Sequence, residues 1–145
     1  MPGLDVVAWQ QDELLIVFGE DHRHAAELRA GADMAQLRQA CWLLREPGSG
    51  TREAAEQALL PHLHGFAEVL QLGGTEAIKQ GAVAGLGLAC LSRHAVADLV
   101  ALGRLHVLAT PLPPLRRRLW VVRHPGKRVP ASLRQLLALP SDVLA

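Results

Sequence analysis

Hydroxyl residues and glycines lie at two places where an apolar run gives way to a helical pattern. The first turn, GSGTR, follows CWLLREP and contains Ser49 and Thr51. The second, LGGTE, follows the apolar run from Val69 to Leu72 and contains Thr75. A helix that begins at such a turn presents unpaired amide groups and a partial positive charge at its first residues, and this arrangement binds anions. If both apolar runs are buried parallel strands, the two turns meet at one edge of a sheet and form a crevice for a small ligand.

These two turns supply the expected ligand-binding residues. An anionic or carboxylate-bearing metabolite would be held by Ser49, Gly50, Thr51, Arg52, Gly74 and Thr75. Arg52 has an alternative role, because Glu56 stands four residues further along the same helix, at a spacing that favours an ion pair. Each motif alone is a weak indicator, since a glycine turn between a strand and a helix also serves simply to reverse the chain.

Catalytic chemistry is not indicated. The turn around Ser49 lacks the G-x-S-x-G form of a nucleophile elbow, because the residue two positions before the serine is Pro47. No acid, base and nucleophile can be assembled around it, so the sequence predicts a protein that is not an enzyme.

Gly85 and Gly87 follow a helix, whereas the glycines of a phosphate-binding loop precede one. They are instead typical of a helix end followed by a tight entry into a strand.

The histidines and cysteines indicate neither a metal nor a cofactor. His62 and His64 form an H-x-H pair that could ligate a metal if further ligands converged, but no cysteine or carboxylate cluster lies near them in the sequence. They are interpreted as exposed loop histidines, as are the histidines at positions 22 and 24. Cys41 and Cys90 both lie in apolar runs and are interpreted as buried free thiols of a reducing compartment rather than as a disulfide.

Composition is that of a single ordinary domain. The chain has 145 residues, half of them apolar, with two Phe, three Trp and no Tyr, so its core must consist mainly of Leu, Ala and Val. A net charge of +1 gives no sign of a nucleic-acid-binding surface. The only dense basic run, Arg116 to Arg118, is interpreted as a solvated strand edge or a paired patch rather than as a phosphate contact. No apolar run approaches the roughly 18 to 20 residues of a membrane span, and the start of the chain does not resemble a signal peptide.

Strand and helix patterns alternate along the chain, which predicts an α/β architecture with parallel pairing. The expected strands cover residues 12–18, 41–45, 66–72, 88–91, 105–108 and 119–122. The expected helices cover residues 34–40, 51–61, 75–83, 92–102 and 131–139. The helix after Gly50 is expected to end by Pro61, because proline removes a backbone donor and clashes with the preceding turn. Residues 20–32 are expected to form a loop.

The order of these motifs resembles the effector-binding domain of LysR-type transcriptional regulators. The resemblance rests on LLREPGSGTR, LGGTEAIKQGAVAGLGLACLSR, a G-R-L turn at 103–105, RRRLWVVRHPG and SLRQLLAL, and it covers about residues 12–139. It implies a periplasmic-binding-protein-like (type 2) α/β fold, in which two subdomains joined by crossing strands hold an effector between them. Residues 1–22 would then be the end of the first subdomain and the first crossing strand, 23–105 the complete second subdomain, and 106–145 the second crossing strand and the return to the first subdomain. Phe18 and Gly19, at the end of the first crossing strand, join the expected ligand-binding residues.

The resemblance also implies a function. The chain would be the cytoplasmic, effector-sensing fragment of a regulator, in which a small molecule modulates DNA binding by a winged helix-turn-helix that these residues do not include. A homo-oligomer is expected, with the helix at 51–61 and the strand at 66–72 as its pairing surface, although the alanine-rich face of that helix could equally be buried in the core. The alternative function is a stand-alone periplasmic-type solute-binding module.

Overall fold

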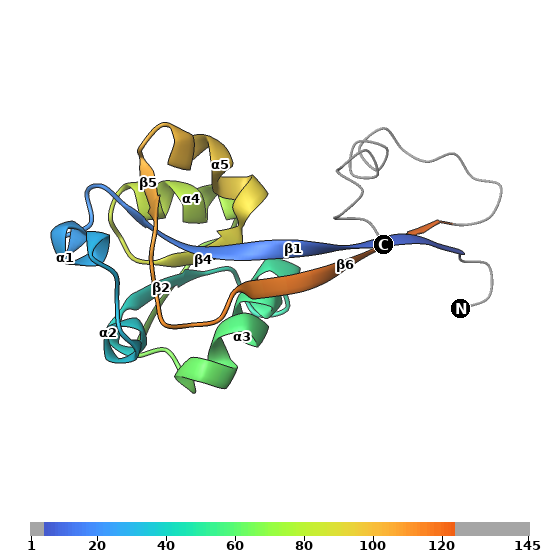
Figure 1. Ribbon diagram of the computed structural model, residues 1–145, viewed down its shortest axis with the longest axis horizontal. Coiled ribbons are helices and arrows are strands. Elements are labelled where there is room, and N and C mark those ends of the chain that lie inside the picture. The colour runs from blue at the N-terminus through green and yellow to red at the C-terminus, as the bar shows by residue number, and fades with distance from the viewer. Residues whose placement is uncertain (1–4, 124–145) are drawn as a thin grey trace. The chain divides into compact units, whose positions relative to one another are not determined.

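The computed structural model describes residues 5–123, and Figure 1 shows the arrangement of their helices and strands. The elements follow one another as β1 (Asp5–Gly19), α1 (Ala25–Arg29), α2 (Met34–Gln39), β2 (Cys41–Leu44), α3 (Gly50–Leu63), β3 (Glu68–Gln71), α4 (Thr75–Val83), β4 (Ala89–Ser92), α5 (Arg93–Ala101), β5 (Leu105–Val107) and β6 (Leu115–Arg123). The helix expected at 131–139 lies outside the described residues. Residues 13–115 form one compact unit, and the described residues outside it, 5–12 and 116–123, belong to another. The subdomain boundaries expected from the sequence stay a prediction.

The strands of the larger unit meet in both parallel and antiparallel pairs. β2 and β3 are parallel, with Trp42 opposite Val69, as the alternation of strands and helices predicts. Trp42 also forms a parallel bridge with Leu88, the residue before β4. β1 is antiparallel to both β4 and β5, and β6 pairs with β1. Apolar periodicity does not encode strand direction, so the antiparallel pairing of β1 is not predictable from it.

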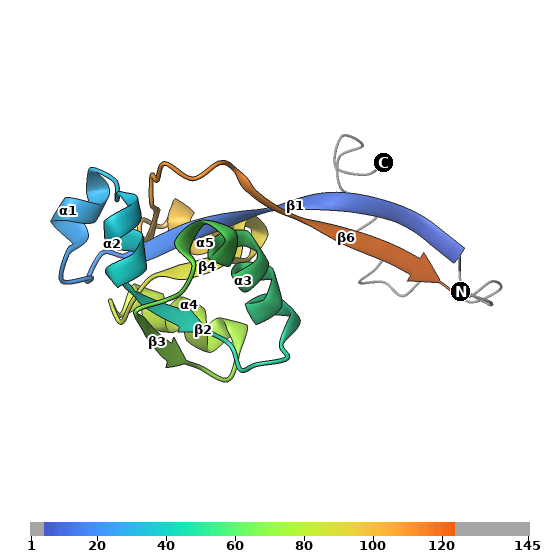
Figure 2. The same ribbon diagram turned by 90° about the horizontal axis from the view of Figure 1, so that it is seen from below.

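Helices α3 and α4 cover opposite faces of β2 (Figures 1 and 2). Alternate side chains of a strand point to opposite faces, and the two core clusters follow this rule. Trp42 and Leu44 belong to the cluster that contains the buried residues of α3, which are Ala55, Leu59 and Leu63. Leu43 belongs to the other cluster, with Ile78 and Ala82 of α4. The predicted burial of the run from Trp42 to Leu44 is therefore confirmed, because each of these side chains is at most 2% exposed.

The prediction that the run from Val69 to Leu72 is buried is wrong. Every residue of β3 is exposed, with 41% of Val69 and 37% of Leu70 accessible. β3 pairs only with β2 among the described strands, so it is an edge strand. An apolar run of this length does not distinguish an edge strand from a central one.

The expected end of the helix at Pro61 is also wrong, because α3 continues to Leu63. Leu59 and Leu63 lie one turn apart on the same face and are both fully buried, so core packing offsets the backbone hydrogen bond that proline cannot make. The helix ends where His64 adopts the left-handed conformation, with φ of 65°, and donates its amide to the carbonyl of Leu60.

The remaining local expectations are mostly met. The helix at 75–83 is confirmed, and Ser92 caps α5, which ends at Ala101 with Leu102 as its C-cap. Gly85 has φ of 82°, the left-handed conformation expected at this helix end. Residues 20–32 are not a continuous loop, because they contain α1. Cys41 and Cys90 are not joined in a disulfide, and of the two only Cys90 is fully buried. No helix in residues 5–123 is long and apolar enough to cross a membrane.

Candidate functional site

The carboxyl ends of β2 and β3 lie at the same edge of the sheet, because these strands are parallel and adjacent. Each leads directly into a helix, β2 into α3 and β3 into α4. Since α3 and α4 cover opposite faces of the sheet, this edge is a topological switch point, the place where open α/β sheets bind ligands. The structure thus brings the two predicted turns together, with Ser49, Gly50, Thr51 and Arg52 on one side and Gly74 and Thr75 on the other. We call this edge, where the sequence predicts a ligand-binding crevice, the strand-end crevice.

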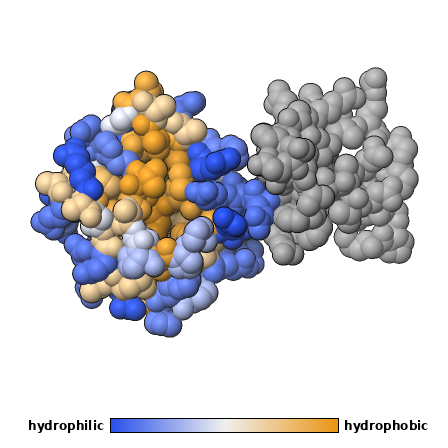
Figure 3. Space-filling view, viewed as in Figure 1, coloured by the Kyte–Doolittle hydropathy of each residue, from blue (hydrophilic) through white to orange (hydrophobic). Residues whose placement is uncertain are grey.

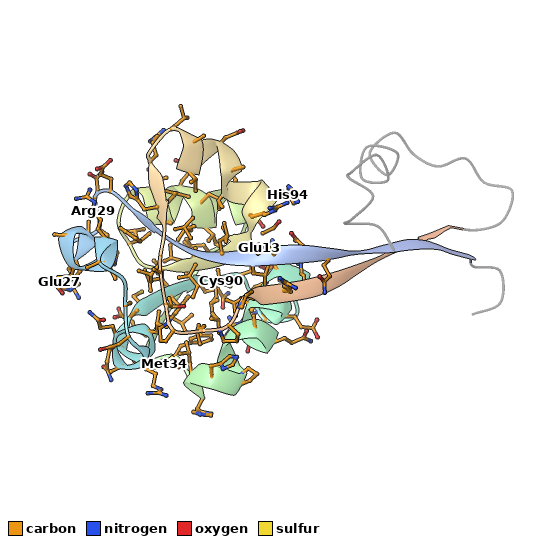
Figure 4. The ribbon with its side chains drawn as sticks, viewed as in Figure 1. Glu13, Glu27, Arg29, Met34, Cys90 and His94 are labelled. Carbon is orange, nitrogen blue, oxygen red and sulfur yellow. The ribbon has the colours of Figure 1, made fainter. Side chains whose placement is uncertain are left out.

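A third helix begins at the same edge. The approach to β4 is parallel to β2, and β4 ends at Ser92, which caps α5 by accepting a hydrogen bond from the amide of His94 at 3.3 Å. Leu14 of β1 is the register partner of Ser92, so Glu13 lies next to this helix start. Figure 4 shows Glu13 on β1 and His94 at the beginning of α5. Sequence reasoning identified the cap but did not assign it to the crevice, because the direction of β4 relative to β2 was not known.

The start of α3 is partly satisfied by its own cap. The hydroxyl of Ser49 accepts hydrogen bonds from the amides of Thr51 at 3.2 Å and Arg52 at 3.4 Å. These two amides are therefore not unpaired, which corrects the expectation that the first turn of this helix is fully open to a ligand. A serine hydroxyl is both a donor and an acceptor, so Ser49 can still donate its hydrogen to a ligand oxygen.

The start of α4 is the more open of the two predicted turns. Its cap residue is Gly74, and no described side chain makes a capping hydrogen bond there. The helix has Glu76 in its first turn, where a carboxylate is favourable, and Lys79 contacts that carboxylate at 3.2 Å. The first-turn amides of α4 are consequently the best-placed anion-binding groups of the crevice.

Arg45 joins the two helix starts, and sequence reasoning missed it. It follows β2 directly, and its guanidinium donates to Thr75 Oγ1 at 3.3 Å. It also makes two contacts with the carboxylate of Glu46, at 2.8 Å and 3.3 Å. These hydrogen bonds hold the pKa of Glu46 below its usual range. The sequence signal that could have identified Arg45 is its position between a buried strand and a glycine turn.

Arg52 takes the alternative role that its sequence position allowed. Its Nε donates to Glu56 Oε1 at 3.0 Å, and its Nη1 donates to the carbonyl oxygen of Arg45 at 3.0 Å. The second bond ties the first turn of α3 back to the end of β2. Together with the bond from Arg45 to Thr75, it makes one polar network that spans the crevice from helix to helix.

A family model of the LysR substrate binding domain matches residues 1–145. The chain belongs to this family. The transcriptional regulator YeiE of Escherichia coli, called uncharacterized and HTH-type, is 43% identical over 129 residues, which are 89% of this chain and 43% of that protein. The HTH-type regulator CfxR of Cupriavidus necator is 41% identical over 112 residues, 76% of this chain and 35% of that protein. The chain therefore spans less than half the length of these relatives.

The fold of this LysR domain is the predicted one. The regulatory domain of CcmR from Synechocystis PCC6803, solved in complex with 2-PG, superposes with a TM-score of 0.67 at 30% identity and covers 92% of this chain and 64% of its own. The architecture is the periplasmic-binding-protein-like (type 2) α/β fold of LysR effector domains. The relatives named here are transcriptional regulators.

Two of the expected ligand-binding residues lie away from the strand-end crevice of this LysR domain. The ring of Phe18 is 1% exposed and packs against His106, with the ring centroids 5.4 Å apart. Gly19 abuts the backbone of Ala82 and Val83, at the end of α4 opposite to Thr75. The structure therefore does not bring these two residues together with the helix starts.

The histidines do not form a metal centre within the described residues. No group of three or more His, Cys, Asp or Glu side chains in the described chain is placed to hold a metal ion. His62 belongs to the last turn of α3 rather than to a loop, and His64 is its exposed cap residue. His22 and His24 lie together beyond the end of β1, with their rings 5.8 Å apart.

The basic run at 116–118 contains a paired charge, because Arg117 pairs with the buried Asp12 at 3.2 Å.

Proposed function

We propose that this chain is the effector-sensing part of a LysR-type transcriptional regulator and that it binds a small anionic metabolite at the strand-end crevice. The observation that carries the proposal is that Arg45 joins the starts of α3 and α4 at a topological switch point. The ligand-binding residues are Ser49, Gly50, Thr51, Arg52, Gly74 and Thr75, to which the geometry adds Arg45. The complex of the CcmR domain with 2-PG supports a small-molecule effector.

In the same proposal, the protein responds to the effector by a change in the angle between its two subdomains. An effector held by the first turn of α4 and by Arg45 would also contact groups of the other subdomain, so binding would favour one angle over another. DNA contact is assigned to a helix-turn-helix of the kind that the relatives' names describe. A stand-alone solute-binding module is the less favoured alternative, because the curated relatives are regulators.

The effector proposal is tested by calorimetry with a panel of carboxylated and phosphorylated metabolites that includes 2-PG. For any compound that binds, Thr75→Ala and Arg45→Gln should each weaken the affinity about tenfold, since a hydrogen bond to a charged group is worth about 1.5–3 kcal/mol. Thr51→Ala should have a smaller effect, because the start of α3 is already capped by Ser49, whereas the start of α4 has no side-chain cap and is the better-placed anion site.

Thr110→Ala is the matched control for the threonine variants. The hydroxyl of Thr110, like that of Thr75, accepts a hydrogen bond, in this case from the amide of Leu112 at 3.3 Å, but Thr110 lies in the connection after β5. Its removal should leave the affinity unchanged. If Thr75→Ala and Arg45→Gln also leave the affinity of every binding compound unchanged, the ligand does not bind at the strand-end crevice.

We also propose that the chain forms a homo-oligomer through the exposed edge of β3. An edge strand presents unpaired backbone groups that can pair with a second copy, and the exposed apolar side chains of Val69 and Leu70 add burial to such a contact. Ala55 is 2% exposed, so the alanine face of α3 is occupied by the core, and only the outer side of the helix remains for this interface.

Val69→Lys is therefore expected to shift the chain from dimer to monomer in sedimentation velocity. A lysine on an edge strand opposes strand pairing between copies. The control is Leu102→Asp, because Leu102 is 72% exposed at the end of α5. Figure 3 shows a band of apolar surface on the face that carries β5, so this control tests a competing surface. A dimer lost with Leu102→Asp and kept with Val69→Lys would place the interface on that face instead.

A further inference from the structure

A hollow of about 470 Å³ lies at the end of β2 opposite to the strand-end crevice. Its apolar floor is formed by Leu28, Ala40 and Leu88, and Cys41, the first residue of β2, is in its wall. Helices α1 and α2 stand beside it, and Figure 4 shows Glu27 on α1 and Met34 on α2. The volume is within the range of about 300–1,000 Å³ that is typical of small-molecule sites.

Two opposite charges line this hollow without being paired. Arg23 and Glu68 both belong to its wall. Neither side chain has a hydrogen-bond or ion-pair partner within residues 5–123, and they do not pair with each other. Both nevertheless act on the thiol of Cys41, where Glu68 raises the pKa and Arg23 lowers it, in addition to the larger effect of burial, which raises it. An unpaired carboxylate and an unpaired guanidinium therefore flank the same thiol, separated by more than an ion-pair distance.

The neighbouring histidine adds a neutral donor. The amide of His24 donates to Nδ1 of His22 at 3.0 Å, so this nitrogen is an acceptor and the proton of the neutral ring lies on Nε2. Burial, followed by His24 and Arg23, lowers the pKa of His22, which favours the neutral ring. His24 itself lies 3.9 Å from the carboxylate of Glu27. The hollow thus offers separate positive and negative groups above an aliphatic floor.

We propose that this hollow is a second binding site, for a free α-amino acid with an aliphatic side chain. Arg23 would bind the ligand carboxylate, Glu68 the ligand ammonium, and Leu28 and Leu88 the side chain. A simple anion would meet the carboxylates of Glu68 and Glu27, and a simple cation would meet Arg23. A molecule that carries both charges satisfies both sides, which is why the proposal commits to a zwitterion. This site does not depend on the effector proposed for the crevice.

Cys41 provides a reporter for this site in the 145-residue chain. The rate of its alkylation by iodoacetamide is measured with increasing L-leucine, with 4-methylpentanoate, which lacks the ammonium, and with isopentylamine, which lacks the carboxylate. Cys90 is 4% exposed, and the variant Cys41→Ser gives the background from it. L-leucine should slow the alkylation of Cys41, and each single-charge analogue should need at least about a tenfold higher concentration for half protection, since a hydrogen bond to a charged group is worth about 1.5–3 kcal/mol.

Variants at the two charges separate the two contacts. Arg23→Gln should raise the half-protecting concentration of L-leucine about tenfold without raising that of isopentylamine, from which it removes a like charge. Glu68→Gln should likewise weaken L-leucine without weakening 4-methylpentanoate. Glu68→Gln should also speed the unliganded reaction and Arg23→Gln should slow it, so protection is scaled to each variant's own rate. Arg104→Gln and Glu53→Gln, at exposed positions elsewhere, are the matched controls, and circular dichroism verifies that each variant is folded.

The proposal is overturned if L-leucine gives no protection, if all three compounds protect equally, or if neither Arg23→Gln nor Glu68→Gln changes the protection. It is also overturned if Thr75→Ala abolishes the protection, because L-leucine would then act from the strand-end crevice. Loss of effector binding at the crevice with intact protection of Cys41 would leave the second site standing, so failures of the two proposals can be told apart.

Discussion

Gly19→Ala is expected to lower the free energy of unfolding by about 3 kcal/mol, at the upper end of the range for overpacked cores. A β-carbon at this position would lie 2.7 Å from the carbonyl oxygen of Val83 and closer still to that of Ala82. Both are backbone atoms at the end of α4, so they cannot move aside as a flexible side chain could. Gly19 does not have a positive φ, and the cost is therefore steric rather than conformational.

Urea denaturation followed by circular dichroism measures this loss, and Gly65→Ala is its control. Nothing lies within 4 Å of a β-carbon built at Gly65, and its φ is also ordinary. The control should change the stability by no more than about 0.5 kcal/mol, as is usual for surface substitutions. Equal stabilities of the two variants would show that β1 and α4 are not packed as described. This close contact is sufficient to explain why position 19 is a glycine, and no contact with a ligand is needed to explain it.

The elements that the sequence predicts well are those whose ends are marked by glycine, proline or helix-capping residues. Trp42 to Leu44 is a short apolar run closed by a proline and a glycine turn, and Ser49 caps the helix that follows, so strand, turn and helix are all visible. Thr75 to Val83 is likewise bounded by Gly74 and by Gly85, and the helix has the predicted limits. Local signals of this kind depend on neighbouring residues only.

Features that depend on tertiary packing could not be predicted in the same way. Burial of Leu63 carries α3 past Pro61, and the position of β3 at an edge exposes Val69. Both outcomes are decided by residues distant in the chain. The same holds for Arg45, whose part in the crevice requires knowing that Thr75, thirty residues later, lies within a hydrogen bond of it.

The hollow beside Cys41 shows this limit most clearly. Its wall combines residues from before α1, from α1, α2, β2 and β3, and from the turn after α4. No motif joins Arg23 to Glu68, because neither residue is part of a recognisable spacing. The two charges become a candidate site only when the parallel pairing of β2 and β3 places Glu68 opposite Cys41.

Trp42→Ala is expected to destabilise the protein by about 3–5 kcal/mol, the usual cost of removing a large buried aromatic side chain. Trp42 is fully buried in the middle of the sheet, and its ring lies 5.6 Å from that of Phe66. Its indole nitrogen donates to the carbonyl oxygen of Leu37 at 2.9 Å, which ties α2 to β2. Both the packing and this hydrogen bond are lost in the alanine variant.

Trp42→Phe separates the two contributions. It keeps an aromatic ring but leaves the carbonyl of Leu37 without its donor, so its cost should be smaller, about 1–3 kcal/mol. Leu102→Ala, at a 72% exposed position, is the control and should be nearly neutral. A loss below about 1 kcal/mol for Trp42→Ala would contradict the assigned core. β2 carries Cys41 at one end and leads to Arg45 at the other, so it connects the two proposed binding sites. If the contact between α2 and β2 positions these sites, Trp42→Phe should weaken ligand binding at both. If α3 and α4 alone hold β2 in place, Trp42→Phe should weaken binding at neither.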